Sequence, residues 1–175
     1  MTLQEAQSAL KTLDDWFATP TTPQKNTVVV GVATMFALNW NGSVDRSDNG
    51  VGAWGAKTAN KTIMGCSLPE AVLIGTAGLS GTWNQCKAAV GKWLAEDQVQ
   101  ARVTLDGVSA LCDVVDTGPA RWTHNFIDLT YAAAHVLDTQ GYATVAVEIL
   151  AKGVPVEIRG WDIKNGCEIQ MAGTV

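Results

Sequence analysis

Hydrophobic residues recur along the chain at two spacings, and the change of spacing divides the chain into two parts. The first part has helical spacing, carried by Leu3, Ala6, Leu10, Leu13 and Phe17. Thr2 and Glu5 form a capping box before it, and the Thr/Pro stretch 19–23 ends it. We therefore expect residues 1–26 to be an N-terminal helix with a linker, and residues 27–175 to form the main domain.

The pattern of the main domain is typical of β-strands. Residues 28–38 form an apolar, β-branched run, and apolar residues alternate with polar ones over 99–105 and 108–114, on both sides of Asp106-Gly107. Asp-Gly between alternating segments is the sequence of a type I′ hairpin turn. Further strands are expected over 144–150, 154–158 and 168–171.

Two further segments, 83–96 and 129–137, have helical spacing. With the N-terminal helix they bring the expected total to three helices, beside about six or seven strands. No internal repeat is visible in the sequence. Because closing the sheet removes its exposed edges, we predict a mainly β fold with helical insertions, built as a closed barrel.

Composition and charge restrict the classes of function. The 175 residues are 47% hydrophobic and 17% charged, which is typical of a globular domain and excludes a disordered chain. The formal net charge of −5 opposes binding to phosphate-rich nucleic acid. No apolar run reaches the roughly 18 residues of a membrane span. We expect neither a nucleic-acid partner nor a membrane span.

The four cysteines, at positions 66, 86, 112 and 167, do not have the spacing of a zinc site. They allow two disulfides in any of three connectivities, or four reduced thiols. The sequence also lacks a metal-ligand cluster and a glycine-rich phosphate loop, so no metal and no cofactor are expected. No signal peptide is recognisable at the start of the chain.

The candidate chemistry lies in segment 114–137, which predicts a buried strand, a loop and a helix. Asp116 stands at the end of the strand and Asp128 at the start of the helix, so two carboxylates bracket a loop that contains Trp122. Apolar residues flank Asp128, and both desolvation and a neighbouring carboxylate raise the pKa of an Asp. An Asp that stays protonated near neutral pH can protonate a leaving glycosidic oxygen.

Each of these residues also has a structural interpretation. Asp128 is well placed to be the N-cap of the helix, and Asp116 stands in an Asp-x-Gly-Pro turn, where Asp accepts backbone hydrogen bonds. His124 in the polar loop is either a ligand-binding residue or an ordinary surface residue. His135 follows three alanines inside the helix and is expected to be structural.

The same segment resembles a known family. Asp-x-Gly-Pro, a loop and Ile-Asp-Leu-Thr-x-x-Ala-Ala, over residues 116–134, look like the second half of a double-psi β-barrel. The pattern is closest to bacterial cell-wall proteins of the rare lipoprotein A type, and is similar to the first domain of expansins, to barwin and to family 45 endoglucanases. Residues 67–69 (Ser-Leu-Pro) and 52–55 (Gly-Ala-Trp-Gly) resemble further elements of these proteins. The resemblance implies a six-stranded double-psi β-barrel, to which the helix over 83–96 looks like an addition.

The resemblance also implies roles for individual residues. Asp128 falls on the essential acid of expansin-like domains, which is the general acid of the endoglucanases. Asp116 falls on a catalytic candidate of the bacterial wall proteins, and Thr34 on a threonine that lies in the groove near the acid. The candidate substrate-binding residues in the two flanking loops are Trp40, Asp48, Trp54, Trp122 and His124. The tryptophans among them would stack on sugar rings, whereas Trp83 and Trp93, on the predicted helix, are expected to pack.

Three positions depart from the family's pattern. Gly65 stands where the bacterial wall proteins have a histidine, and Thr117 stands where they have an arginine. The family 45 enzymes need a second aspartate soon after the first strand, and none is present there; Asp45 or Asp48 could replace it only if the long loop 39–55 folds back. The resemblance therefore does not extend plainly to the inverting hydrolysis of the endoglucanases.

The expected function is activity on a cell-wall polysaccharide, with peptidoglycan cleavage of the lytic transglycosylase type as the leading reaction. One alternative is an expansin-like or carbohydrate-binding domain that does not cleave its ligand. Another is an inactive scaffold or interaction module, which the glycine at position 65 favours. The partner would be peptidoglycan or a cellulose-like glycan, and the place of action the cell envelope or the extracellular space.

Overall fold

The computed structural model describes residues 26–162 and 167–168. The helix expected near the start of the chain lies outside these residues, as does most of the strand expected over 168–171. The main strands are β1 (Val28–Met35), β2 (Gly65–Leu68), β3 (Gln100–Leu105), β4 (Val108–Thr117), β5 (Ile127–Leu129) and β6 (Ala143–Ala151). The helices are α2 (Glu70–Thr76), α3 (Trp83–Glu96) and α4 (Tyr131–Leu137), with a 3-10 turn η1 (Arg121–Thr123).

The six strands close into a mixed barrel. They are hydrogen-bonded in the order β1-β5-β2-β4-β3-β6, and β6 pairs again with β1 to close the ring. The pairs β1–β5 and β2–β4 are parallel, and the other four pairs are antiparallel. Short strands β7 (Val154–Pro155), β8 (Trp161–Asp162) and β9 (Cys167–Glu168) follow the barrel. The expected mainly β fold with a closed barrel is thus confirmed.

The pairing pattern has an internal symmetry. Exchanging β1 with β4, β2 with β5 and β3 with β6 turns the parallel pair β1–β5 into the parallel pair β2–β4, and the antiparallel pair β3–β4 into β1–β6. The same exchange leaves the pairs β2–β5 and β3–β6 unchanged. The barrel therefore consists of two halves of equivalent topology, although the sequence contains no visible repeat.

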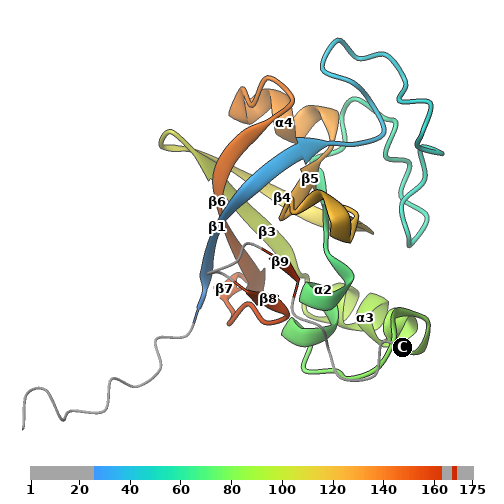
Figure 1. Cartoon of the computed structure of the whole chain (residues 1–175), viewed down its shortest axis with the longest axis vertical. Helices are drawn as coiled ribbons and strands as arrows, with labels where there is room; N and C mark the ends of the chain where they lie inside the picture. The colour runs from blue at the N-terminus through green and yellow to red at the C-terminus, as the bar shows by residue number, and fades with distance from the viewer. Residues whose placement is uncertain (1–25, 163–166, 169–175) are drawn as a thin grey trace, which may run out of the picture.

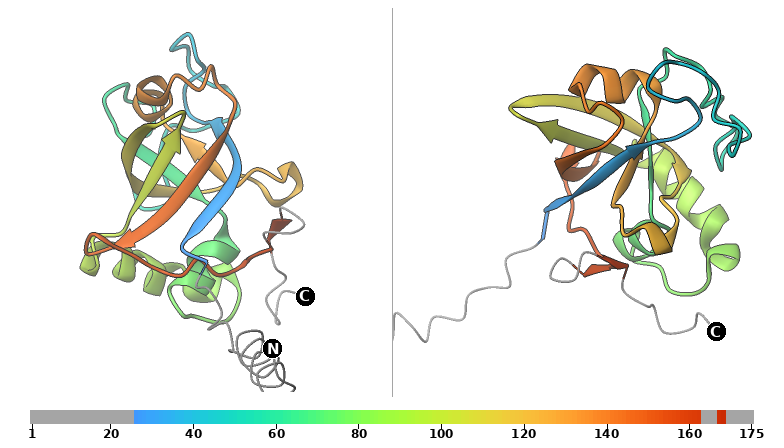
Figure 2. Two further views of the ribbon diagram at one scale, coloured as in Figure 1. Left: turned by 90° about the vertical axis from the view of Figure 1, so that its left-hand side faces the viewer. Right: turned by 45° about the horizontal axis from the view of Figure 1, so that its top comes forward.

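The helices lie at the two ends of the barrel. Figure 1 shows α4 at one end, beside the long connection between β1 and β2, and α2 with α3 at the other end. The two views in Figure 2 show the same separation, with the strands crossing between the ends. Because α2 packs on α3, the second end is covered by a pair of helices rather than by loops.

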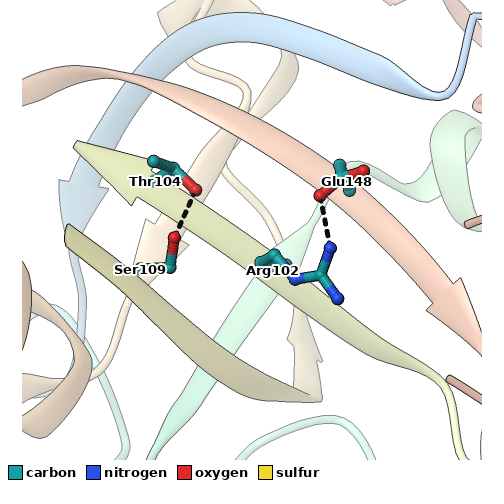
Figure 3. A network of polar contacts seen from close by, with 4 residues as sticks. All are labelled: Arg102, Thr104, Ser109 and Glu148. Carbon is teal, nitrogen blue, oxygen red and sulfur yellow. Dashed lines mark hydrogen bonds and ion pairs between the residues drawn. The ribbon is translucent and has the colours of Figure 1, made fainter. Parts of the chain in front are cut away.

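Alternation along the strands defines the core. Val103 of β3 and Val147 of β6 are register partners and are fully buried. Their neighbours in sequence face outward, where Arg102 forms an ion pair with Glu148 at 2.8 Å (Figure 3). This arrangement is what an antiparallel sheet with one solvated face requires. The alternation read from the sequence over 99–105 therefore identified the buried face of β3 correctly.

Some elements of the structure were predicted correctly from the sequence, and others were missed. Helix α3 begins and ends as predicted, and the Asp106-Gly107 turn has positive φ at both residues, as type I′ requires. Strands β2 and β5 and helix α2 were not predicted. Strands of four residues or fewer, fully or largely buried, show no alternation that sequence periodicity could detect.

Candidate functional site

Four polar side chains form a row across adjacent strands of the barrel. Thr34 of β1 is the register partner of Asp128 in β5, and Asp128 is the partner of Ser67 in β2. Ser67 is in turn the partner of Asp116 in β4. Residues in register on adjacent strands project to the same side of a sheet. The two predicted carboxylates are therefore brought together, two strands apart, with their α-carbons roughly 10 Å from each other.

The row lies on the outer side of the barrel wall. Ile127 and Leu129 are fully buried in the core, and Asp128 between them is only partly buried. Since successive side chains on a strand point to opposite faces, the Asp128 carboxyl points away from the core. Asp128 is part of β5, and the N-cap position of α4 belongs to Thr130. The interpretation of Asp128 as a helix cap is thus wrong, because Leu129 and Thr130 lie between Asp128 and the first residue of α4.

Burial is the main influence on the Asp128 carboxyl. The pKa of Asp128 is raised from 3.8 to about 6, chiefly by burial and to a smaller extent by the charges of Asp116 and Asp48. Hydrogen bonds from the hydroxyls of Thr34 and Ser67 lower this pKa and partly offset the burial. At mildly acidic pH a substantial fraction of Asp128 is therefore protonated, which is the state that a general acid needs.

A short chain of hydrogen bonds orients Asp128. The Asn125 side-chain amide donates to the Thr34 hydroxyl at 3.4 Å, and that hydroxyl donates to Oδ1 of Asp128. The hydroxyl has one proton to give, so it is directed to the carboxyl. The second oxygen, Oδ2, does not accept this bond, and the Ser67 hydroxyl also donates to the carboxyl.

The backbone at Gly118 passes close to that second oxygen. A Cβ built at this position would lie 3.4 Å from Oδ2 of Asp128 and 3.3 Å from the Ser67 hydroxyl. Gly118 also has a φ of 144°, which L side chains rarely adopt. Glycine at this position therefore leaves Oδ2 and the Ser67 hydroxyl without an overlying Cβ.

Asp116 is held by backbone amides. Its Oδ1 accepts hydrogen bonds from the Ala53 and Thr117 amides, both at 2.8 Å. Burial raises the pKa of Asp116, these two amides lower it, the charge of Asp48 raises it, and that of Lys87 lowers it. The turn interpretation of Asp116 is therefore correct as far as Oδ1 is concerned, and the same residue also belongs to the polar row.

The long connection between β1 and β2 folds back onto the site. The amide of Ala53 reaches Asp116, and Asp48 lines a cavity of about 380 Å³ together with Asp116 and Lys87. The close approach depends on Gly52, where a Cβ would lie 2.2 Å from the Val115 carbonyl oxygen. The folded-back loop, stated as a condition in the sequence analysis, is thus present for Asp48.

The three candidate tryptophans lie in different environments. Trp122 is 82% exposed on η1. Trp40 stacks on His135 of α4, with ring centroids 3.8 Å apart, and His135 in turn stacks on Tyr131. Trp54 packs edge-on against Trp83 of α3 at 6.0 Å. Trp122 has the most freely accessible ring of the three, and His135 has the structural role expected of it.

His124 and the described cysteines are not members of the polar row. His124 ends η1 in the left-handed conformation and is exposed. Cys66, Cys86 and Cys112 are buried free thiols, and burial raises the pKa of Cys112 to about 12. A buried thiol with a raised pKa is a packing residue rather than a nucleophile. Over the described ranges 26–162 and 167–168, no cluster of side chains suitable for a metal ion occurs.

Four residues of this site had no assigned role in the sequence analysis: Ser67, Asn125, Gly118 and Lys87. Ser67 stood in the Ser-Leu-Pro element and Gly118 in the Asp-x-Gly-Pro motif, so the signal for both was present. Neither motif shows that a serine would lie between the two aspartates, because this follows from the pairing of β2 with both β4 and β5. Lys87 had no signal beyond being a charged residue on a helix.

Fold and site together define a closed six-stranded mixed β-barrel that carries two carboxyls and two hydroxyls in one row. No protein-family model and no curated protein sequence matches the chain. Among solved structures, the chain is similar to the Streptomyces papain inhibitor, with 19% identical residues and a TM-score of 0.46. The alignment covers 73% of this chain and 97% of the inhibitor. None of the helices in the described part of the chain is long and apolar enough to span a membrane.

Proposed function

We propose that this protein cleaves a cell-wall glycan, with Asp128 as the general acid. The observation that carries the proposal is the state of the Asp128 carboxyl. It is partly buried, has a pKa of about 6, accepts hydrogen bonds from the Thr34 and Ser67 hydroxyls, and has no side chain at Gly118 to cover Oδ2. A carboxyl with a raised pKa, of which a substantial fraction keeps its proton at mildly acidic pH, is what protonation of a glycosidic oxygen requires.

The proposed reaction needs no protein base for water. Asp128 donates its proton to the glycosidic oxygen as the bond from that oxygen to the anomeric carbon breaks. A hydroxyl of the same sugar then attacks the anomeric carbon, and its proton returns to the Asp128 carboxylate. The products are an anhydro sugar end and a free hydroxyl end, and the acid is regenerated. This is the lytic transglycosylase type of reaction, for which peptidoglycan is the proposed polymer.

Asp116 supports this step by its charge. Two backbone amides on its Oδ1 favour the ionised form, and an anion near the anomeric carbon stabilises the positive charge that develops there. The same amides make Asp116 a fixed group rather than a mobile base. This supports a mechanism with a single proton-transferring acid over one that requires two exchangeable carboxyls.

We further propose that the barrel is of the double-psi type. The support is the exchange symmetry of strand pairing, with two parallel pairs related by the exchange of the two halves. In this arrangement both hydroxyls of the row come from the first half and both carboxyls from the second. A protein acting on a wall glycan would work outside the cell membrane, in the envelope or the extracellular space.

Glycan binding without cleavage is the second candidate. It is favoured by Gly65, a position at which the resembling bacterial wall proteins have a histidine, and whose amide and carbonyl here bond to Thr130. A Cβ at residue 65 would lie 2.9 Å from the Val115 side chain, so this barrel has no room for a larger residue there. In such a domain Asp128 would hydrogen-bond a sugar hydroxyl instead of protonating a leaving group.

The test is product release from purified peptidoglycan sacculi and from cellulose, compared between the natural protein and the Asp128→Asn variant. Cleavage predicts soluble fragments with the natural protein and a loss of about 100-fold or more with the variant, the range for a general acid. Mass spectrometry distinguishes anhydro ends from reducing ends. Asp106→Asn is the matched control, because it removes the same charge in a turn that favours Asn.

Each outcome decides between the candidates. Soluble fragments that disappear with Asp128→Asn and persist with Asp106→Asn support cleavage by Asp128. Fragments that persist unchanged in both variants rule out Asp128 as the acid. No fragments from either polymer, with retention of the protein on the insoluble glycan, would replace cleavage by the binding function.

A further inference from the structure

Helix α3 forms one wall of the cavity that contains Asp116 of the polar row. The cavity of about 380 Å³ is lined from one side by the loop that carries Asp48 and from the other by α3. Trp83 and Lys87, one helical turn apart on α3, face it together with Asp116 and Thr117 of β4. The volume is at the lower end of the range for small-molecule sites, which suits one small unit of a polymer better than a long segment.

The polar groups around this cavity can accept or donate further hydrogen bonds. Asp48 accepts the Gly50 amide with Oδ1 at 2.6 Å, and Asp116 accepts two amides with its Oδ1. In the described part of the chain, the Oδ2 atoms of both residues have no hydrogen-bond donor, and Lys87 has no ion-pair partner within 4 Å. Acceptors and a three-proton donor therefore line the same space without satisfying each other.

The charge of the cavity selects among ligands. Two carboxylates and one ammonium give it a net negative charge when all are ionised, and the chain as a whole has a net charge of −5. An anionic sugar would meet repulsion here. A neutral sugar would not, since each of its hydroxyls can donate to a carboxylate and accept from the ammonium.

We propose that this cavity is a subsite for a neutral sugar unit, held by Asp48 and Lys87 next to the bond that Asp128 protonates. The inference rests on the proposed function for its position beside the acid. It deepens that function by stating which unit lies on the Asp116 side: an uncharged hexose or N-acetylhexosamine, not a uronic acid or another acidic sugar. Because α3 is an addition to the pattern of the resembling families, this subsite depends on residues particular to this chain.

The test uses the Asp128→Asn variant, which is expected to bind without turnover, and three soluble tetrasaccharides as probes. These are chitotetraose, cellotetraose and tetragalacturonic acid, titrated by calorimetry and by tryptophan fluorescence. We expect binding of at least one neutral probe and markedly weaker binding of the acidic one. Introducing Lys87→Gln or Asp48→Asn should weaken binding of the neutral probe about tenfold, the usual effect of losing one hydrogen bond to a charged group.

Lys92→Gln is the matched control. Lys92 lies on the same helix, is largely exposed, and forms an ion pair with Glu96 at 3.8 Å, so its change should leave the affinity within about twofold. Equal effects of Lys87→Gln and Lys92→Gln, or tighter binding of the acidic probe, would overturn the inference. So would the absence of binding by all three probes.

Failure of the subsite and failure of the proposed function give different results. If the natural protein releases soluble fragments from sacculi but Lys87→Gln and Asp48→Asn match the Lys92→Gln control, cleavage stands and the subsite does not. If no fragments form but the neutral probe binds through Lys87 and Asp48, the subsite stands and the protein is a glycan-binding domain.

Discussion

The hydroxyl of Thr34 in β1 donates a hydrogen bond to Oδ1 of Asp128 in β5, its register partner in a parallel strand pair. This bond opposes the effect of burial, because it stabilises the ionised carboxylate and lowers the pKa of Asp128. Burial is stronger, so the pKa remains at about 6. The two largest influences on the acid strength of this group are therefore of opposite sign, and the Thr34 hydrogen bond can be removed separately.

Replacing Thr34 by Val should raise the pKa of Asp128. The substitution keeps the β-branched shape and removes the hydroxyl, so burial acts without its main opponent. Carboxyl carbon NMR of aspartate-labelled protein measures the pKa directly, and the loss of turnover at high pH should move upward with it. Thr104→Val, on the outer face of β3, is the control. An unchanged Asp128 titration in Thr34→Val would contradict this account of the site.

Asp128→Asn should change the dependence of stability on pH. Because the folded protein holds the proton of Asp128 more tightly than the unfolded chain, its stability falls as pH rises from about 4 to about 6. The cost is complete above this range and corresponds to about 3 kcal/mol for a pKa change from 3.8 to about 6. Asn has no proton to lose, so the variant should be more stable than the natural protein at pH 8, by up to this amount, and about equal to it below pH 4.

Urea unfolding from pH 3.5 to pH 8 measures this difference in the free energy of unfolding. Asp106→Asn again serves as the control and should follow the natural protein at every pH, because the residue lies in an exposed turn. A variant curve parallel to that of the natural protein would show that Asp128 is ionised as easily in the folded state as in water.

Gly52→Ala should detach the long loop from β4. Its Cβ would lie 2.2 Å from a backbone oxygen of Val115, which cannot move as a side chain can, so we expect a loss of about 1–3 kcal/mol. The Ala53 amide, the Asp48 charge and part of the burial of Asp116 would be lost together. Because burial is the largest of these influences, the pKa of Asp116 should fall toward its ordinary value. Gly55→Ala is the control, since it has a positive φ but no atoms within 4 Å of a Cβ. It should cost stability without changing the titration of Asp116.

Gly91→Ala should destabilise the protein although alanine favours helices. A Cβ at residue 91 of α3 would lie 2.5 Å from Nε1 of Trp54, and the gain in helix propensity is only about 1 kcal/mol. The indole must shift, which tryptophan fluorescence should report. A double-mutant cycle with Trp54→Phe tests the cause: the cost of Gly91→Ala should shrink when the indole nitrogen is gone. An equal cost in both backgrounds would place the strain elsewhere.

The sequence was informative where local pattern and global fold agree. Helix α3 has amphipathic spacing and a capping box between Thr82 and Gln85, so both its ends could be predicted. The hairpin at Asp106-Gly107 follows from the need for positive φ at both residues. The parallel pairs β1–β5 and β2–β4 could not be read in this way, because they join segments far apart in the chain and two of the strands are very short.

The candidate site could likewise be predicted from the sequence only in part. Asp116 and Asp128 could be selected from their residue types and neighbours, since an Asp between two core residues must be partly desolvated. That Ser67 separates them, and that Lys87 faces Asp116, depends on tertiary pairing alone. The tryptophans illustrate the limit of composition: Trp40 and Trp54 are of the right type for stacking on a ligand, but their rings stack on His135 and pack against Trp83.

The polar row is shared between the two halves of the barrel, so separating the halves would change the pKa of Asp128. The carboxyl of Asp128 comes from one half, and the hydroxyls that align it come from the other. A slight parting of β2 from β5 would admit water, lower the pKa of Asp128 toward its ordinary value and leave the carboxyl ionised even at mildly acidic pH. The proposed proton donation would then stop while most of the barrel was still folded, so it would require a molecule whose two halves are fully joined.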